Sequence, residues 1–198
     1  MRVNGRQLPV GSSCAFGRLA KGRRALNSLF AGFAVPILIR GREQRVEEQA
    51  NLDVIRWTEL ELPEGLEMLV SEAVVSGHAW AANFHAAWRS RPFTNVGEAL
   101  LLASSGTNLL GMAALTADPF VEDATTGRLR FIYVRHTARR QGVAERLVRD
   151  CLALARGRWR TLRLQTDNAF AARLYERHGF RPSASDPRAT HTMALAST

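Results

Sequence analysis

Residues 134–144 read VRHTARRQGVA, where an apolar run ends, a basic turn follows and a helical pattern begins at Gly142. The first turn of a helix has unpaired backbone N–H groups and a partial positive charge, so it is a ready site for a phosphate. Gly142 lets a bulky anion approach the backbone closely, and Ala144 keeps the first helical turn narrow. Arg139 and Arg140 add charge where a pyrophosphate would lie. Taken alone, the stretch is equally typical of an arginine-rich surface turn.

A second motif follows farther along the chain. Residues 162–180 read LRLQTDNAFAARLYERHGF, in which a strand pattern leads into a helical one. Together the two motifs resemble the acyl-coenzyme A-binding half of GNAT-superfamily N-acetyltransferases. That family carries Val-x-Pro-x-x-(Arg/Gln)-x-x-Gly-x-(Gly/Ala), then a strand, and then Asn-x-x-Ala-x-x-Leu-Tyr-x-x-x-Gly-Phe. This chain has His136 at the proline position and matches the pattern at Val134, Arg139, Gly142, Ala144, Asn168, Ala171, Leu174, Tyr175, Gly179 and Phe180.

The resemblance implies an acetyl-coenzyme A-dependent N-acetyltransferase that acts by direct transfer in a ternary complex. Backbone groups of the strand before the basic turn would pair with the pantetheine arm, as an added strand pairs with a sheet edge. The turn itself would hold the pyrophosphate. For Asn168, capping of the helix that it opens carries equal weight with a coenzyme contact. The implied coenzyme-binding residues are Ile132, Tyr133, Val134, Arg139, Arg140, Gln141, Gly142, Val143, Ala144 and Asn168.

The resemblance also makes Tyr175 the candidate catalytic residue, because a phenol near the departing thiolate could protonate it. Packing of the ring against the sheet is the alternative. Many family members place a glutamate base four residues before the valine, but this chain has Arg130 there, and an arginine cannot act as a base at neutral pH. Besides a water chain, the sequence leaves four candidates open for the amine proton: Glu98, Asp118, Glu122 and His85.

Hydrophobic periodicity outlines the whole domain. Strands are expected at residues 53–57, 98–103, 108–117, 129–134, 161–165, 180–183 and 191–195. Helices are expected at residues 63–77, 79–91, 142–155 and 168–177. This order predicts an α+β fold of the GNAT type, a mixed sheet of six to seven strands with helices on both faces.

Aromatic residues recur at helical spacing at Trp80, Phe84 and Trp88. Such a stripe more often faces a core, although the resemblance places the acceptor pocket in this region. The histidines are scattered without metal-ligand spacing, so no metal site is expected.

The positive charge is concentrated in residues 1–50, which carry nine basic and three acidic side chains. Residues 51–198 carry eighteen arginines and fifteen acids. We therefore expect a basic, poorly ordered N-terminal extension followed by the GNAT-like N-acetyltransferase domain, with no specific nucleic-acid partner. Polyanion binding through the basic tail is one alternative. A non-catalytic acyl-coenzyme A-binding regulatory module is another.

Two cysteines, Cys14 and Cys151, cannot form a disulfide framework, which favours a reducing, cytoplasmic location. The longest apolar run, residues 29–39, is too short to span a bilayer, so no membrane span is expected. The acceptor would be a small-molecule or peptide amine. The sequence leaves the acceptor's identity, the length of the acyl chain and the oligomeric state open, a homodimer included.

Overall fold

The computed structural model describes residues 51–196, which contain one mixed sheet of seven strands in the order β1-β2-β3-β4-β5-β7-β6. The extension expected over residues 1–50 lies outside this range. The strands are β1 (Asp53–Trp57), β2 (Ala99–Ser105), β3 (Asn108–Ala117), β4 (Thr126–Val134), β5 (Thr161–Leu164), β6 (Arg181–Asp186) and β7 (Ala189–Ala194). The helices are α1 (Leu66–Val75), α2 (Phe84–Ser90), α3 (Val143–Ala155) and α4 (Ala169–Arg177), with 3₁₀ turns at Ala81–Asn83 and His136–Ala138.

The predicted α+β sheet with helices on both faces is confirmed, and the differences from expectation lie at element ends. The helix expected over residues 79–91 is divided into a 3₁₀ turn and α2. α2 ends at Ser90. The next residue, Arg91, is extended because the proline that follows it disfavours the helical conformation. β4 begins at Thr126, earlier than the apolar pattern indicates, because Thr126, Gly127 and Arg128 are all buried in the sheet.

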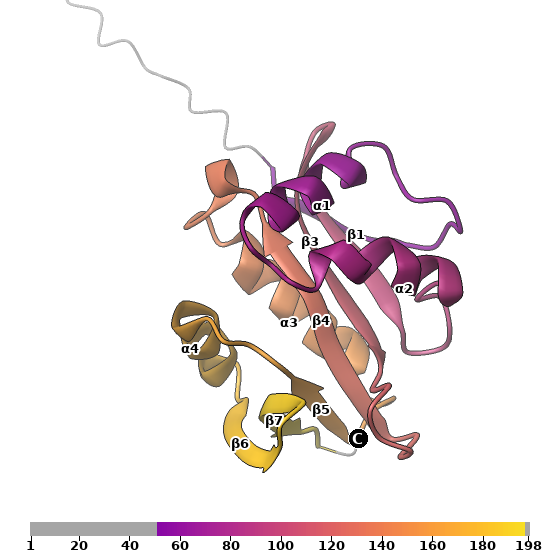
Figure 1. Cartoon of the computed structure of the whole chain (residues 1–198), viewed down its shortest axis with the longest axis vertical. Helices are drawn as coiled ribbons and strands as arrows, with labels where there is room; N and C mark the ends of the chain where they lie inside the picture. Colours follow the sequence, from indigo (N-terminus) through magenta and orange to yellow (C-terminus); the bar gives the residue numbers. More distant parts are fainter. Residues whose placement is uncertain (1–50, 197–198) are drawn as a thin grey trace, which may run out of the picture. The chain divides into compact units, whose positions relative to one another are not determined.

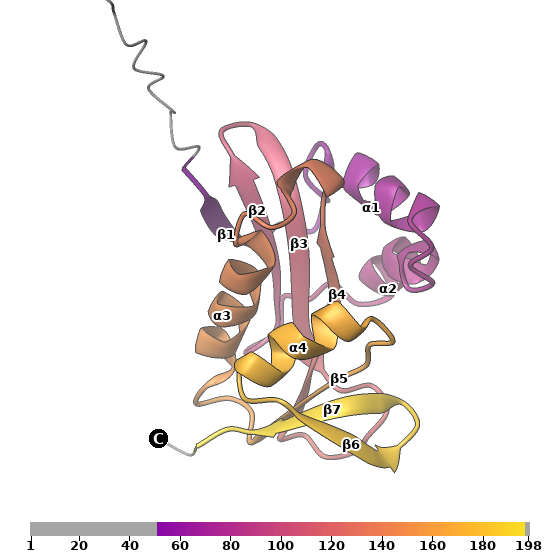
Figure 2. The same cartoon turned by 90° about the vertical axis from the view of Figure 1, so that its left-hand side faces the viewer.

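Helices cover the two faces of the sheet with separate apolar cores (Figure 2). On one face, α3 packs Leu147, Val148 and Cys151 against the sheet, and each of these side chains is fully buried. On the other face lie α1 and α2, whose core includes Leu69 and Phe84. A fully buried side chain of this kind contributes roughly 1.5–3 kcal/mol, so the two cores fix the sheet on which the site is built.

β4 contains a β-bulge that changes the direction of its side chains. Arg130 lies opposite Ala114 of β3, whereas Tyr133 lies opposite Met112, so β4 has one extra residue between these pairs. Phe131 occupies this position with a φ of 57°, in the left-handed region that non-glycine residues rarely adopt. As a result Arg130 and Phe131, although consecutive, both lie on the face that α1 and α2 cover.

β4 and β5 are paired at one end only. Their parallel register joins residues 126–128 to residues 161–163. Beyond this point β4 continues to Val134, whereas β5 ends at Leu164, and Figure 1 shows the two strands diverging. The far end of β4 is therefore paired with β3 on one side but not with β5 on the other.

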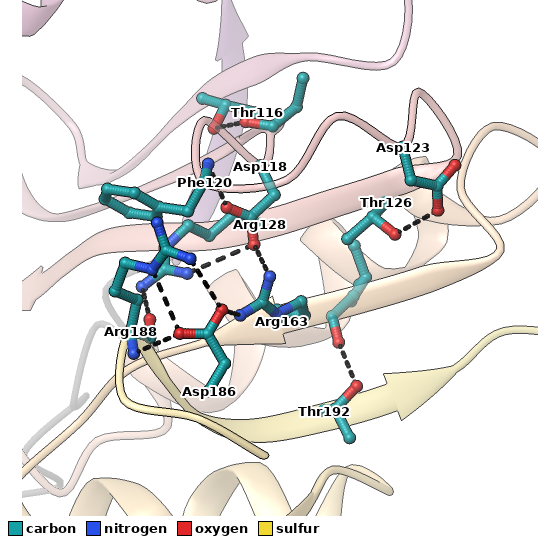
Figure 3. Close-up of polar contacts among 12 residues, drawn as sticks. Thr116, Asp118, Phe120, Asp123, Thr126, Arg128, Arg163, Asp186, Arg188 and Thr192 are labelled. Atoms are coloured by element: carbon teal, nitrogen blue, oxygen red, sulfur yellow. Dashed lines mark hydrogen bonds and ion pairs between the residues drawn. The ribbon is translucent and has the colours of Figure 1, made fainter. Parts of the chain in front are cut away.

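A buried ion network lies at the joined end of these two strands (Figure 3). Arg128 and Arg163 face each other directly in the β4–β5 register, an unfavourable position for two like charges. The carboxylate of Asp118, which is fully buried, lies between them, with Oδ2 at 3.3 Å from a guanidinium nitrogen of each. Arg163 also donates to Asp186 at 2.6 Å. Asp118 thus supplies the negative charge that lets the two strands pair.

Removal of this charge should destabilise the domain. We expect Asp118→Asn to lower the free energy of unfolding by about 3–5 kcal/mol, because two buried guanidinium groups would lose their shared counterion. Urea denaturation followed by circular dichroism measures the change. Glu122→Gln is the control, since Glu122 is an exposed neighbour, and should change stability by no more than about 0.5 kcal/mol. Equal stability of the two variants would contradict the role given to Asp118.

Candidate active site

A groove of 870 Å³ opens between the diverging end of β4 and α4, and we call it the main groove. Most of the residues predicted to bind a coenzyme line it, as does the predicted catalytic tyrosine: Ile132, Tyr133, Val134, Arg139, Arg140, Ala144, Asn168 and Tyr175. Gly142 and Val143 line an adjoining cavity of 340 Å³, which shares Arg139 and Arg140 with the groove. Gln141 lines neither, and its side chain donates to the carbonyl oxygen of Thr137 at 2.9 Å.

The turn before α3 presents a row of free backbone donors. Arg140 and Gly142 both adopt the left-handed conformation, with φ of 60° and 80°. No acceptor within residues 51–196 pairs with the backbone N–H groups from Arg140 to Ala144. Such a row at a helix N-terminus is an anion-binding arrangement. A Cβ atom added at Gly142 would meet nothing within 4 Å beyond its chain neighbours in the described part of the protein, so the space beside this position is open.

Asn168 performs the capping role that the sequence offered as one of its two readings. Its side-chain oxygen accepts hydrogen bonds from the backbone N–H groups of Phe170 at 2.9 Å and Ala171 at 3.2 Å. These bonds satisfy two of the unpaired donors at the start of α4. Because Asn168 also lines the main groove, its side-chain NH₂ group is available for a second contact.

Tyr175 combines a packing role with a position on the groove. Its side chain is 7% exposed and packs edge-on against Phe180, with ring centroids 6.0 Å apart. Burial raises the pKa of its phenol well above the ordinary value, so the group stays protonated at neutral pH. No hydrogen-bond partner for this hydroxyl is found in the part of the chain that the structure describes. A protonated hydroxyl without a partner suits a proton donor.

A second cavity, of 460 Å³, lies on the face of the sheet that α1 and α2 cover, and we call it the aromatic pocket. Its walls include Trp80, Phe120 and Phe131. The predicted aromatic stripe is therefore divided: Trp80 lines the pocket, whereas Phe84 and Trp88 are buried in the core at 0% and 3% exposure.

His78, which sequence reasoning set aside, lies where the two cavities meet. It lines the main groove, the aromatic pocket and a 130 Å³ cavity that it shares with Arg130 and Tyr175. Its ring packs edge-on against Tyr133, with centroids 5.3 Å apart. Burial lowers the pKa of the His78 imidazole, and the positive charge of Arg139 lowers it further. Within the described range neither ring nitrogen has a partner, so a neutral imidazole faces the junction.

The four side chains offered by the sequence as bases lie elsewhere. Glu98 is buried and accepts from the backbone N–H of Ala117 at 2.8 Å, and Asp118 is held in the arginine network. His85 pairs with Glu67 at 2.9 Å, and Glu122 is an exposed loop residue. None of the four lines the main groove or the aromatic pocket.

The acetyltransferase (GNAT) family model matches residues 55–180 of this sequence. The chain therefore belongs to the GNAT acetyltransferase family, whose members are acyltransferases that act on amine acceptors. The fold, the motifs and the match agree with one another, and the predicted family is confirmed.

Solved structures give the same fold. A presumed acetyltransferase from Exiguobacterium sp. 255-15 aligns with a TM-score of 0.64 and 25% identity, over 73% of this chain and 93% of that one. An acetyltransferase from Streptococcus agalactiae 2603 aligns with a TM-score of 0.58 and 16% identity, over 73% of this chain and 98% of that one. A GNAT-family acetyltransferase from Streptococcus pneumoniae aligns with a TM-score of 0.55 and 19% identity, over 74% of this chain and 100% of that one. No curated protein sequence matches the chain.

No three His, Cys, Asp or Glu side chains within residues 51–196 lie together as metal ligands would. No helix in the same range has the length and apolar character needed to cross a membrane.

Proposed function

We propose that the protein transfers an acetyl group from acetyl-coenzyme A directly to the amine of a small molecule or peptide, in the cytoplasm. One observation carries the proposal: five consecutive N–H groups, from Arg140 to Ala144, have no acceptor within residues 51–196 and lie beside a groove of 870 Å³. A diphosphate needs such donors, and a groove of this size suits a long, narrow ligand. The residues present therefore fit coenzyme A.

Each part of the main groove suits a different part of the coenzyme. The donors from Arg140 to Ala144 would hold the diphosphate, with added charge from Arg139 and Arg140. The free edge of β4 at residues 132–134 would pair with the amide groups of the pantetheine arm. The spare NH₂ group of Asn168 would contact the same arm.

His78 is the residue we assign to take the proton from the amine. It lies at the junction of the groove and the aromatic pocket, which is where an acceptor amine must meet the acyl group. An alkyl ammonium has a pKa of about 10 and an ordinary histidine about 6.5, and the pKa of His78 is lowered, so the transfer is uphill by at least about 5 kcal/mol. A turnover of about 10 per second corresponds to an activation free energy of about 16 kcal/mol, which is large enough to include the cost of this proton transfer.

Tyr175 is the residue we assign to protonate the leaving thiolate. When bound, the coenzyme supplies the activated acetyl thioester, and the protein's part is to place a proton donor beside the sulfur. Tyr175 is protonated and lines the groove together with His78.

Direct transfer is favoured over a covalent acyl-enzyme. Cys151, the free cysteine within the described range, is fully buried against the sheet and has its pKa raised by burial. A thiol in this state is a poor nucleophile. Both reactants must therefore be bound together, the acyl donor in the groove and the amine in the aromatic pocket.

Calorimetric titration with acetyl-coenzyme A, and with coenzyme A for comparison, tests the coenzyme site. We expect micromolar binding at one site per chain, followed by thiol release when an acceptor amine is added. Binding without turnover on any amine would favour a regulatory module. Absence of binding by folded protein would end the proposal.

Gly142→Glu should weaken acetyl-coenzyme A binding by at least about 100-fold, because a carboxylate would stand in front of the free N–H donors. Gly106→Glu is the matched control: Gly106 also has a positive φ and open space, but it lies in the β2–β3 turn away from both cavities. The two variants share the backbone strain, so only the first should lose affinity in calorimetry. Equal affinities would show that the anion site is elsewhere.

Tyr175→Phe should lower the single-turnover rate of acetyl transfer by about 100-fold, the lower range for loss of general acid catalysis. The substitution keeps the ring that packs on Phe180, so thermal stability and coenzyme affinity should stay close to those of the original protein. Rapid-quench kinetics with saturating acetyl-coenzyme A gives the rate. An unchanged rate would leave Tyr175 with the packing role alone.

His78→Gln should remove the acidic limb of the pH profile of kcat/KM for the amine. The neutral imidazole is the active form, so activity is present above the pKa of His78 and is lost as the pH falls through it. Because that pKa is lowered, we expect the midpoint of the limb below about 6.5. His85→Gln is the control, because His85 lies outside both cavities, and it should keep the acidic limb. If the acidic limb persists in His78→Gln, His78 is not the base.

A further inference from the structure

Arg130 is a charged residue whose partner is missing from the described part of the protein. Within residues 51–196, no hydrogen bond or ion pair involves its guanidinium group. Its one specific contact is with an aromatic ring, since the guanidinium carbon lies 4.1 Å from the centroid of Phe131. The residue is partly buried and lines the aromatic pocket.

The bulge in β4 explains this position. In a regular strand Arg130 and Phe131 would lie on opposite faces of the sheet. The extra residue and the left-handed φ of Phe131 place both side chains on the pocket side. The aromatic ring then lies against the guanidinium, and no polar group within residues 51–196 pairs with its N–H groups, which can therefore donate to a ligand.

The surroundings of Arg130 carry an excess of positive charge. In the adjoining network, three guanidinium groups (Arg128, Arg163 and Arg188) share the two carboxylates of Asp118 and Asp186. Arg130 adds a further charge that neither carboxylate contacts. Burial lowers its pKa, the nearby Arg128 lowers it further and the charge of Asp118 offsets part of this, although an arginine remains charged. A partly buried cation of this kind is best satisfied by an anion from outside the protein.

We propose that Arg130 binds an anionic group of the acceptor, so that the preferred acceptor is a small amine that also carries a carboxylate or a phosphate. The planar fork of an arginine matches either group with two parallel hydrogen bonds. This inference rests on the acetyl transfer proposed above, because it takes the aromatic pocket as the place where the amine binds.

The pocket carries groups suited to both charges of such a molecule. Arg130 would hold the anionic group, and His78, which lines the same pocket at its junction with the main groove, would receive the amine. Asp167 also lines the pocket and would attract an ammonium group. Trp80 and Phe131 add apolar walls. A volume of 460 Å³ suits a metabolite-sized molecule.

Matched pairs of amines test this assignment. L-Phenylalanine is compared with 2-phenylethylamine, and β-alanine with ethylamine, because each pair differs only by a carboxylate. O-Phosphoethanolamine is compared with ethanolamine for the phosphate. Thiol release from acetyl-coenzyme A gives kcat and KM for each amine. We expect kcat/KM for the best anionic acceptor to exceed that of its neutral partner by about 10- to 100-fold.

Substitutions at Arg130 separate recognition from folding. Arg130→Gln should abolish the preference for the anionic member of each pair, mainly through a higher KM for the anionic amines. Arg130→Lys, which keeps the charge but not the fork, should retain part of the preference. Arg158→Gln is the control, because Arg158 also stacks on an aromatic ring, Trp159 at 4.3 Å, but is exposed and lines neither cavity. It should keep the full preference.

Affinity measurements keep this inference separate from the proposed function. Arg130→Gln should bind acetyl-coenzyme A as tightly as the original protein, and a loss like that of Gly142→Glu would mean that Arg130 serves the coenzyme. If no amine releases thiol, the transfer reaction fails, but ligand-observed NMR titration of the same pairs with coenzyme A present still tests Arg130. Tighter binding of the anionic members, lost in Arg130→Gln, supports the assignment. Equal binding or turnover within every pair would overturn it.

Discussion

The site depends on the pairing of β4 with β5 at one end and their separation at the other. Two strands paired along their whole length would leave no groove, and two unpaired strands would leave no continuous sheet. The joined end brings two arginines face to face, and the buried carboxylate of Asp118 makes that contact favourable. The open end provides an unpaired strand edge and the 870 Å³ groove. One buried charge therefore supports the geometry in which the coenzyme half of the site is formed.

Because of the bulge at Phe131, β4 presents different groups to the main groove and to the aromatic pocket. On the side of the main groove, the strand offers backbone groups to a long ligand. On the side of α1 and α2, it places Arg130 beside an aromatic ring and next to the pocket. His78 belongs to the loop after α1 and lines both cavities where they adjoin. The cavities proposed for the donor and the acceptor thus meet at His78.

The residues proposed to bind the coenzyme could be chosen from sequence because they belong to two short motifs, residues 132–144 and the segment that begins at Asn168. The unpaired donors of residues 140–144 and the cap at Asn168 follow from local backbone rules, which short motifs express directly. The acceptor half could not be predicted in this way. His78 and Arg130 are far apart in the chain, and they meet only through the packing of α1 and the irregular register of β4. The aromatic spacing from Trp80 to Trp88 predicted a core, and the 3₁₀ turn that separates Trp80 from the rest has no periodic signature.

Arg128 and Arg130, two residues apart on the same strand, have different freedom to vary. Arg128 is tied to Asp118, so any replacement disturbs the sheet itself. Within residues 51–196 the guanidinium of Arg130 makes no hydrogen bond or ion pair and lies against one aromatic ring, so a different side chain there changes the charge of the pocket with little effect on the sheet. With the role proposed for Arg130, selection could act on acceptor choice at this one position while the proposed coenzyme-binding frame stays constant. Among relatives with this fold, the residue at this position is the first place to look for a change of substrate.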